Sequence, residues 1–226
     1  MVKIICICGL DGAGKTTLIN HIMTYYKLKG LKMKVINLRW RAFLTLTLHL
    51  YSRTRKRTKS IRLSNGIKIS IDLWHEEPVL TKLTPAFLTF DSIIMYTWLK
   101  MLSLLTFRDL IICDRFFLDT LVDLSSNIGK EALTSVYLRF VAYILKKVNY
   151  CIVLIVHPSI SLVRKDDIVS YEDLITKWKI YRYLARLFKL EILDTSNLSV
   201  FNVRDYVINE LASILKSKGD GLIRKY

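Results

Sequence analysis

The chain is poor in the residues that break regular structure, with eight glycines and three prolines among its 226 residues. It also lacks repeats and low-complexity segments, which excludes collagen-like and disordered chains. Apolar residues make up 52% of the sequence, which at this length is enough to bury one full core. We therefore expect a single domain over residues 1–216 and a flexible tail over 217–226, where glycines stand among charged residues.

Cysteine is scarce, and the positions of the four cysteines exclude a zinc site and a disulfide scaffold. Cys6 and Cys8 have no second closely spaced pair with which to form a zinc site. Cys113 and Cys151, like the first two, lie in short apolar runs typical of buried strands, whereas a disulfide scaffold needs cysteines in loops. No basic segment followed by a cleavable apolar run is found near residue 1, so we expect no signal peptide. These features predict a reduced, cytoplasmic protein.

One apolar run, over residues 86–107, is long enough to span a bilayer. It contains Asp91 and Lys100, and a charge near the centre of a bilayer costs about 2.5–3.5 kcal/mol. We therefore expect no membrane insertion. A helix buried in the core and a helix packed against a second subunit both fit the run.

Acidic residues are absent from Gly12 to Ile71, a stretch of 60 residues that holds fourteen lysines and arginines. The whole chain carries 35 Lys and Arg against 19 Asp and Glu, a net charge of +16, so most of the excess lies in this stretch. Such a field attracts phosphate groups, whether on a nucleotide, a nucleic acid or an anionic membrane. Charge alone does not choose among these partners.

Short apolar runs alternate with longer segments of helical period, a pattern typical of α/β proteins in which helices cover both faces of a parallel sheet. The predicted strands are 2–8, 34–38, 110–113, 151–156 and 191–193. The predicted helices are 15–29, 83–106, 118–146, 159–166, 171–189 and 199–216.

The segment Ser60–Leu73 departs from this alternation, because two runs of alternating apolar and polar residues meet at Asn65-Gly66. Asn-Gly accepts the positive φ angles of a tight turn, so the segment predicts a β-hairpin after the basic run Arg53–Lys59. The pattern does not distinguish a hairpin that contacts a ligand from a surface hairpin without a function.

Residues 9–16 read G-L-D-G-A-G-K-T and match G-x-x-x-x-G-K-[ST] at every fixed position, between an apolar strand and a helix. In this motif the backbone N–H groups wrap a polyphosphate, Lys15 reaches the β and γ oxygens, and Thr16 offers its hydroxyl to Mg²⁺. The motif predicts a bound nucleoside triphosphate, and leaves open whether water, a hydroxyl or a phosphate accepts the phosphoryl group. The predicted donor site comprises Gly9, Leu10, Asp11, Gly12, Ala13, Gly14, Lys15, Thr16 and Thr17.

Five motifs, in order along the chain, resemble those of the thymidylate kinase family. They are G-L-D-G-A-G-K-T-T at 9–17, a strand with Asp-Arg-Phe at 110–116, the start of a lid at 158–164, Tyr-x-x-Leu-Ala at 181–185 and I-L-D-T-S at 192–196. The resemblance implies a three-layer P-loop fold around a five-stranded parallel sheet. It implies ATP- and Mg²⁺-dependent phosphoryl transfer to a nucleoside monophosphate, most directly dTMP. It also implies a homodimer with the helix at 87–107 in the interface.

The resemblance assigns roles to three residues around the phosphate loop. Asp114, at the carboxyl end of a parallel strand, would hold Mg²⁺ through water, and Arg115 would clamp the acceptor phosphate. Asp11 would accept a hydrogen bond from the sugar of the acceptor. Two other interpretations stay open, a surface ion pair of Asp114 with Arg115 and contacts of Asp11 with backbone N–H groups.

The predicted lid, over 158–170, carries the cations Arg164 and Lys165. Because the loop at 9–17 has no arginine, the resemblance implies that these lid cations close over the γ-phosphate. An exposed charge cluster without a catalytic role would have the same sequence. Thr195, in the loop after the last strand, joins the donor site by the same resemblance.

The acceptor side departs from the usual motifs of the family. Residues 38–42 read L-R-W-R-A where the family usually has Arg-Glu-Pro-Gly, and Ser92 stands where it has an arginine that contacts thymine. The two arginines can still contact a phosphate, and the tryptophan can stack on a base. dTMP, another monophosphate and another small phosphate acceptor all stay open. The predicted acceptor site comprises Asp11, Arg39, Trp40, Arg41, Asp91, Arg115 and Phe116.

A competing hypothesis is a phosphate-loop ATPase that binds nucleic acid through the basic stretch 53–62, with the aromatic residues Trp40 and Tyr51 near it in the sequence. The chain has little room for a nucleic-acid module, and we find no hydrophobic strand ending in Asp-Glu to activate water. Both points disfavour the hypothesis. A catalytically idle relative of the kinases would carry the same motifs.

Overall fold

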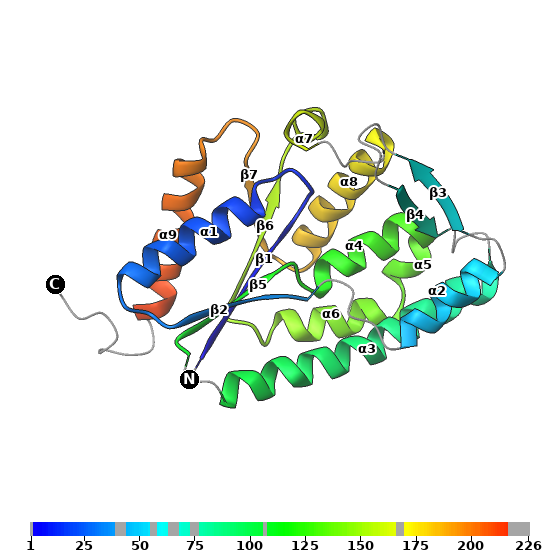
Figure 1. Ribbon diagram of the computed structural model, residues 1–226, viewed down its shortest axis with the longest axis horizontal. Coiled ribbons are helices and arrows are strands. Elements are labelled where there is room, and N and C mark those ends of the chain that lie inside the picture. The colour runs from blue at the N-terminus through cyan, green and yellow to red at the C-terminus, as the bar shows by residue number, and fades with distance from the viewer. Residues whose placement is uncertain are drawn as a thin grey trace.

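The computed structural model describes residues 2–38, 44–54, 58–62, 68–72, 77–105, 108–165 and 170–216. Its centre is a five-stranded, all-parallel sheet with the strand order β2-β5-β1-β6-β7 (Figure 1). All five predicted strands are confirmed, with ends that differ from the prediction by no more than one residue. Their bounds are β1 Lys3–Gly9, β2 Met33–Asn37, β5 Leu110–Asp114, β6 Tyr150–Ile155 and β7 Glu191–Asp194.

The central strand β1 is buried on both faces, which explains its continuous apolar sequence. In the ladder, Cys6 pairs with Cys113 of β5 on one side and with Cys151 of β6 on the other. The cysteines are buried and free, with the sulfurs of Cys8 and Cys151 3.9 Å apart. Burial raises the pKa of Cys6 and Cys8 well above the usual thiol value. These side chains therefore act as small core residues, as predicted.

Helices cover both faces of the sheet, as the alternation of elements predicts (Figure 1). On one face, α1 packs against α9. On the other, α4 packs against α8, with α3 and α6 beside α4. The bounds are α1 Lys15–Leu28, α3 Pro78–Leu105, α4 Phe117–Ile128, α5 Lys130–Leu133, α6 Val136–Leu145, α7 Pro158–Arg164, α8 Tyr171–Leu187 and α9 Val200–Lys216.

The prediction of one helix over 118–146 is wrong, since three helices, α4, α5 and α6, occupy this segment. Gly129 ends α4 with a φ of 76°, a left-handed conformation that glycine adopts without strain. Ser135 then begins α6 as its N-cap, because its side chain accepts a hydrogen bond from the N–H of Leu138. Both breaks follow from local residues that the apolar period concealed.

Helix α2, Leu44–Thr54, was not predicted from the sequence. Its leucines alternate with threonine and histidine, a period of two that is typical of a strand. The helix begins at the buried carboxylate of Asp91 in α3, which accepts hydrogen bonds at 2.9 Å from the N–H groups of Leu44 and Thr45. The Thr45 hydroxyl also donates to it. This capping contact with a residue 46 positions away in the sequence stabilises a helix where the local pattern predicts a strand.

The predicted hairpin is confirmed as an antiparallel pair of strands, β3 Thr58–Arg62 and β4 Lys68–Asp72. Ser60 pairs with Ser70 and Arg62 pairs with Lys68. The pair forms its own two-stranded sheet, apart from the parallel one. The Asn65-Gly66 turn lies outside the described residues, as does the proposed tail over 217–226.

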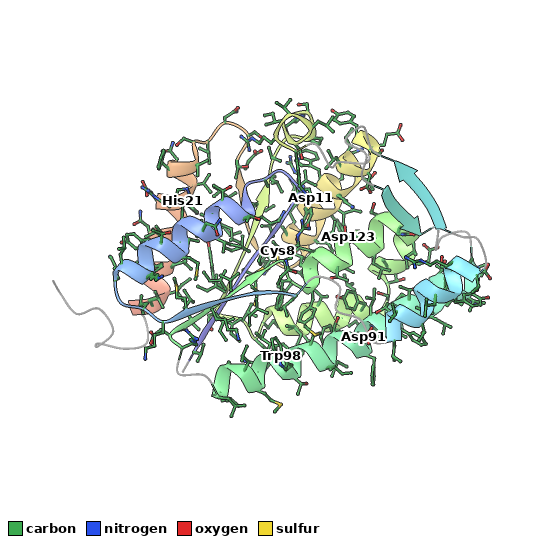
Figure 2. The ribbon with its side chains drawn as sticks, in the orientation of Figure 1. Cys8, Asp11, His21, Asp91, Trp98 and Asp123 are labelled. Atoms are coloured by element: carbon green, nitrogen blue, oxygen red, sulfur yellow. The ribbon has the colours of Figure 1, made fainter. Side chains whose placement is uncertain are left out.

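Helix α3 packs one face on the core and leaves the other exposed. Leu80, Leu88 and Leu99 are buried, whereas Trp98 is 43% exposed and Leu104 is 81% exposed. Figure 2 labels Trp98 on this helix. Within the described residues, α3 alone is long and apolar enough to cross a membrane by length and composition, a test that core helices of soluble proteins also pass. One of the two expectations for this run, a helix buried in the core, is therefore wrong, because one face of α3 is exposed.

Asp91→Ala should destabilise the protein by about 1–3 kcal/mol, because two amides of α2 lose a buried acceptor. The change is measured as the free energy of unfolding in urea. Asp205→Ala, which removes an exposed carboxylate of α9, serves as the control and should change stability by less than about 0.5 kcal/mol. Equal stability of both variants would contradict the capping role.

Candidate functional site

Two glycines, at the end of β1 and in the loop that leads to α1, lie too close to neighbouring elements for a side chain to fit without strain. Gly9 has a φ of 139°, and a Cβ there would lie 1.9 Å from the carbonyl oxygen of Leu154 in β6. Gly12 has a φ of 78°, and its Cβ would lie 2.6 Å from the hydroxyl oxygen of Ser161. The Ser161 hydroxyl donates to the backbone carbonyl of Asp11. The glycines thus let the loop pack closely against β6 and α7.

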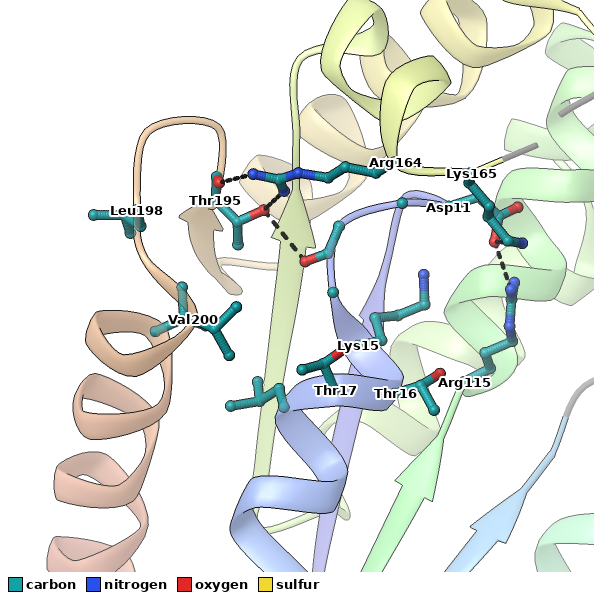
Figure 3. A pocket seen from close by; sticks show the side chains of 15 residues that line it. Asp11, Lys15, Thr16, Thr17, Arg115, Arg164, Lys165, Thr195, Leu198 and Val200 are labelled. Atoms are coloured by element: carbon teal, nitrogen blue, oxygen red, sulfur yellow. Dashed lines mark hydrogen bonds and ion pairs between the residues drawn. The ribbon is translucent and has the colours of Figure 1, made fainter. Parts of the chain in front are cut away.

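A cavity of about 460 Å³ opens over this loop, at the end of the sheet where β1 and β5 terminate (Figure 3). Such carboxyl ends of parallel strands are where ligands of open α/β sheets bind. The cavity is lined by cations from three parts of the chain and by apolar residues near the start of α9. Its lining residues are Asp11, Gly12, Ala13, Gly14, Lys15, Thr16, Thr17, Leu18, Arg115, Arg164, Lys165, Thr195, Leu198, Val200 and Val203.

Lys15, the first residue of α1, is buried, with 6% of its surface exposed. Its ammonium donates hydrogen bonds to the carbonyls of Gly9 and Leu10, at 2.7 Å each. Burial, and then the positive charge of Arg115, lower the pKa of Lys15 to about 8, against the opposing effect of nearby carboxylates. The ammonium is therefore held inside its own loop, charged at neutral pH.

Asp11 faces two cations across the cavity. One of its carboxylate oxygens lies 2.5 Å from the guanidinium of Arg115 and 3.6 Å from the ammonium of Lys165 (Figure 3). Burial alone would raise the pKa of Asp11, but the charges of Arg115, Lys15 and Lys165 outweigh it and lower the pKa below its usual range. Arg115 holds a φ of 63°, a left-handed conformation uncommon for any residue but glycine. Such outliers cluster at functional sites.

Arg164, the last residue of α7, reaches the loop after β7. Its guanidinium donates to the Thr195 carbonyl at 3.2 Å and approaches the Thr195 hydroxyl at 3.5 Å. The Thr195 hydroxyl lies 3.2 Å from the carbonyl oxygens of Ala13 and Ile155. The predicted lid residue and the predicted loop residue therefore meet at one wall of the cavity (Figure 3).

Five of the predicted site residues that the structure describes lie away from the lining of the cavity. Gly9 and Leu10 are buried at the end of β1. Asp91 caps α2, as described above. Phe116 is fully buried and packs on Phe117, with the ring centroids 4.7 Å apart. Asp114 is half-buried at the carboxyl end of β5. The structure brings together the donor-side residues with Asp11, Arg115, Arg164, Lys165 and Thr195. The predicted acceptor residues Arg39, Trp40 and Arg41 lie outside the described residues.

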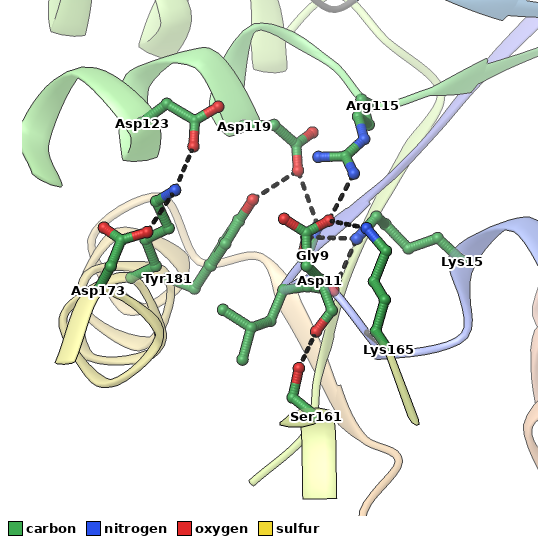
Figure 4. A network of polar contacts seen from close by, with 12 residues as sticks. Gly9, Asp11, Lys15, Arg115, Asp119, Asp123, Ser161, Lys165, Asp173 and Tyr181 are labelled. Carbon is green, nitrogen blue, oxygen red and sulfur yellow. Dashed lines mark hydrogen bonds and ion pairs between the residues drawn. The ribbon is translucent and has the colours of Figure 1, made fainter. Parts of the chain in front are cut away.

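Asp119 in the first turn of α4 was missed by the sequence analysis. It is 1% exposed, and its carboxylate accepts hydrogen bonds from the N–H of Gly9 and from the hydroxyl of Tyr181 (Figure 4). It also accepts one from the N–H of Phe116, the residue before α4, at 2.7 Å. Asp119 lies three residues after Phe116, the N-cap of α4, but a capping box begins with Ser or Thr, so the local sequence did not mark this contact.

The cavity joins the groups that bind anions. The N-terminus of α1 presents backbone N–H groups, Lys15 is buried beside it, and the exposed side chains of Thr16 and Thr17 line the same wall. Within the described residues, no three His, Cys, Asp or Glu side chains gather to hold a metal. A metal ion here would need ligands from a bound phosphate and from water.

The pKa of Lys15 predicts a pH-dependent stability. Between the folded value of about 8 and the ordinary value of 10.5, the unfolded chain binds more protons, so this lysine favours folding increasingly as pH rises. Lys15→Met removes this dependence. The stability of Lys15→Met relative to the unsubstituted protein should therefore fall by about 2–3 kcal/mol from pH 7 to pH 10.

Urea unfolding at the two pH values measures this difference. Lys27→Met, which replaces an exposed lysine of the same helix, is the matched control. A difference for Lys15→Met that does not change with pH would show that the folded chain does not hold Lys15 as the structure indicates.

No protein-family model matches this chain, and no curated protein matches it significantly. The case for a function therefore rests on the chain's own motifs and on the geometry of the cavity.

Proposed function

We propose that the chain is a P-loop nucleoside monophosphate kinase, which transfers the γ-phosphoryl group of Mg·ATP to a monophosphate, with dTMP as the leading candidate acceptor. One observation carries the proposal. The loop at 9–17 opens α1 with Lys15 in a cavity that also holds Arg115 and Lys165. Cations on both sides of one cavity suit a reaction between two phosphate-bearing molecules.

The donor side of the proposal rests on the loop and on Lys15. The N–H groups at the start of α1 would bind the polyphosphate, and Lys15 would exchange its bonds to the carbonyls of Gly9 and Leu10 for phosphate oxygens. Thr16 and, through water, Asp114 would hold Mg²⁺, which neutralises phosphate charge when bound. Leu198, Val200 and Val203 form the apolar edge of the cavity, where a base would lie.

The acceptor side of the proposal rests on Arg115. Its planar guanidinium can bind two phosphate oxygens at once, and Asp11 holds it toward the cavity. The acceptor's phosphate oxygen would form a bond to the γ-phosphorus as the bond from that phosphorus to the β–γ bridging oxygen breaks, leaving ADP. Lys165 and Arg164 would counter the charge that moves between the two phosphates.

The partner in this proposal is a second copy of the chain, packed through the exposed face of α3. Phe90, Ile94, Trp98, Met101 and Leu105 are exposed at spacings of three and four residues, which places them along one side of the helix. A stripe of this kind suits a facing helix. The four free cysteines suit a reducing compartment, the cytoplasm.

Release of ADP from Mg·ATP should depend on a monophosphate. A coupled assay with dTMP, dUMP, UMP, CMP, dCMP, AMP and GMP, and with no acceptor, measures it. Arg115→Ala should lower kcat/KM for the acceptor about 100-fold or more while Mg·ATP still binds, because the lost guanidinium contacts the acceptor phosphate. Arg186→Ala, an exposed arginine at the end of α8, is the control.

The outcomes of this assay separate the hypotheses. Release that dTMP stimulates supports a thymidylate kinase, and release stimulated by another monophosphate keeps the mechanism but changes the substrate. Release of ADP without any acceptor favours the ATPase hypothesis. Stimulation of this release by a nucleic acid would support binding of the nucleic acid through residues 53–62. Full activity of Arg115→Ala would overturn the acceptor assignment.

The proposed dimer should have twice the mass of one chain in solution. Light scattering should give twice 26.4 kDa at micromolar concentration, and Trp98→Glu should give a monomer because it places a charge in the apolar stripe. Leu187→Glu changes an equally exposed leucine on α8 and should leave the mass unchanged. A monomeric unsubstituted protein would exclude this interface.

A further inference from the structure

A row of cations lies where the strands of the parallel sheet begin. Because the five strands run in one direction, the loops that lead into them meet at one end of the sheet, opposite to the cavity. Each strand has a lysine or an arginine in the loop before it or at its first residue. In the strand order β2-β5-β1-β6-β7, these residues, which we call the amino-end row, are Lys32, Arg108, Lys3, Lys146 with Lys147, and Lys189.

Hydrogen bonds hold the loops of the amino-end row side by side. The N–H of Lys3 donates to the carbonyl of Asp109 at 3.1 Å, and the N–H of Asp109 donates to the carbonyl of Lys32 at 2.8 Å. On the other side of β1, the side chain of Asn149 accepts a hydrogen bond from the N–H of Ile4 at 2.8 Å. The cations therefore belong to one continuous surface.

Carboxylates do not balance the charge of this row. Among the residues that the structure describes, no acidic side chain forms an ion pair with any of its cations. At the same end, the carboxylate of Asp109 accepts from the N–H of Lys32, and that of Glu191 accepts from the hydroxyl of Tyr150. The surface therefore has a positive field that attracts a polyanion. The exposed members of the row are Lys32, Arg108, Lys146, Lys147 and Lys189.

Cations near the ends of helices also have a structural use, because they interact favourably with the carbonyls of the last turn. This use accounts for Lys146 and Lys147, at the end of α6. It does not account for Lys32 and Arg108, which directly precede β2 and β5. Lys189 has a φ of 54°, a left-handed conformation in which a lysine is strained and a glycine is not. Stability alone would favour glycine at this position.

The length of the row suits a chain of phosphates. Neighbouring strands lie about 4.8 Å apart, so five strands extend over about 19 Å. A duplex carries a phosphate about every 3.4 Å along each strand, so about five phosphates of one strand face a row of this length.

Two tyrosines near the row add groups on which bases stack. The ammonium of Lys29 lies 4.5 Å from the ring centre of Tyr25, and that of Lys147 lies 5.3 Å from the ring centre of Tyr143. Tyr143 is 57% exposed. Cations that follow a backbone, with aromatic rings beside them, are typical of surfaces that bind nucleic acid without sequence preference.

We propose that the amino-end row binds the phosphate backbone of a nucleic acid without reading its sequence. The inference goes beyond the proposed function and does not depend on it, because the seven residues of β1 separate the row from the cavity by about 20 Å. Figure 1 shows this separation, since α1 and α9 end on the side where the strands begin, away from α7. Contacts of this kind depend on charge and therefore on salt.

The test is the salt dependence of binding, measured by fluorescence anisotropy with the full chain. The probes are random-sequence single-stranded DNA, single-stranded RNA and duplex DNA, each about 20 nucleotides or base pairs long. With about five phosphate contacts, log K against log[salt] should have a slope of about −3.5 for single strands and about −4.5 for the duplex. Absence of binding to all three probes at about 50 mM salt would overturn the proposal.

The row variant combines Lys32→Gln, Arg108→Gln and Lys146→Gln. Its slope should be shallower by about 2–3, and its affinity at low salt should be at least about tenfold weaker, because three phosphate contacts are lost. Its kcat/KM as a kinase should stay unchanged, since the row is remote from the cavity. A purely structural role would lower the stability in urea and leave the slope of the folded protein as it was.

The matched control removes the same charge from exposed positions outside the row. It combines Lys82→Gln, Arg139→Gln and Lys179→Gln, and it should keep the slope of the unsubstituted protein. Equal weakening by the control would show that binding follows net charge and that the row has no role of its own. If the row variant does not fold, Lys32→Gln alone replaces it and should make the slope shallower by about one.

Two further arms compare the row with other surfaces and partners. If neutralising Arg53, Arg55 and Lys56 abolishes binding while the row variant binds normally, the nucleic acid lies on the basic stretch 53–62 and the proposal is wrong. Leu28 is 84% exposed and Leu104 is 81% exposed, at the ends of α1 and α3, and a membrane would take up such side chains. Binding to phosphatidylcholine vesicles with about 30% phosphatidylserine, without binding to nucleic acid, would assign this surface to a membrane instead.

Discussion

The parallel pairing of β1 with β5 and β6 decides where the polar residues of this protein meet. Because the strands run in one direction, the loop after β1, Arg115 after β5 and the start of α7 after β6 all emerge at the same end of the sheet. The strands are buried and almost wholly apolar, so polar chemistry can begin only where they end. The close approach of Gly9 to Leu154 fixes the turn at that point.

Each cation that lines the cavity is bound to another part of the protein. Asp11 pairs with Arg115 and Lys165, Lys15 is bound to backbone carbonyls, and Arg164 is bound to the loop after β7. Each cation therefore has a partner that a phosphate can replace. Binding of an anion would exchange partners instead of exposing new charges, which limits the rearrangement that the site needs.

Much of the parallel sheet was predictable because it depends on short, local patterns. The strands are apolar runs of five or so residues, and Gly9, Gly12 and Gly14 stand in a motif with fixed spacing. Part of what the sequence did not reveal depends on contacts between distant residues. Helix α2 begins at Asp91 of another helix, and Asp119 is hydrogen-bonded to Gly9 and Tyr181, 110 and 62 positions away.

The left-handed backbone of Arg115 links the stability of the protein to its chemistry. An L-residue in this region stores about 1–2 kcal/mol that glycine would not. Glycine at this position would relax the backbone and remove the guanidinium from Asp11 and from the cavity. Under the proposed function, a search for more stable variants would therefore favour the loss of the guanidinium that binds the acceptor, so stability and activity trade against each other at this position.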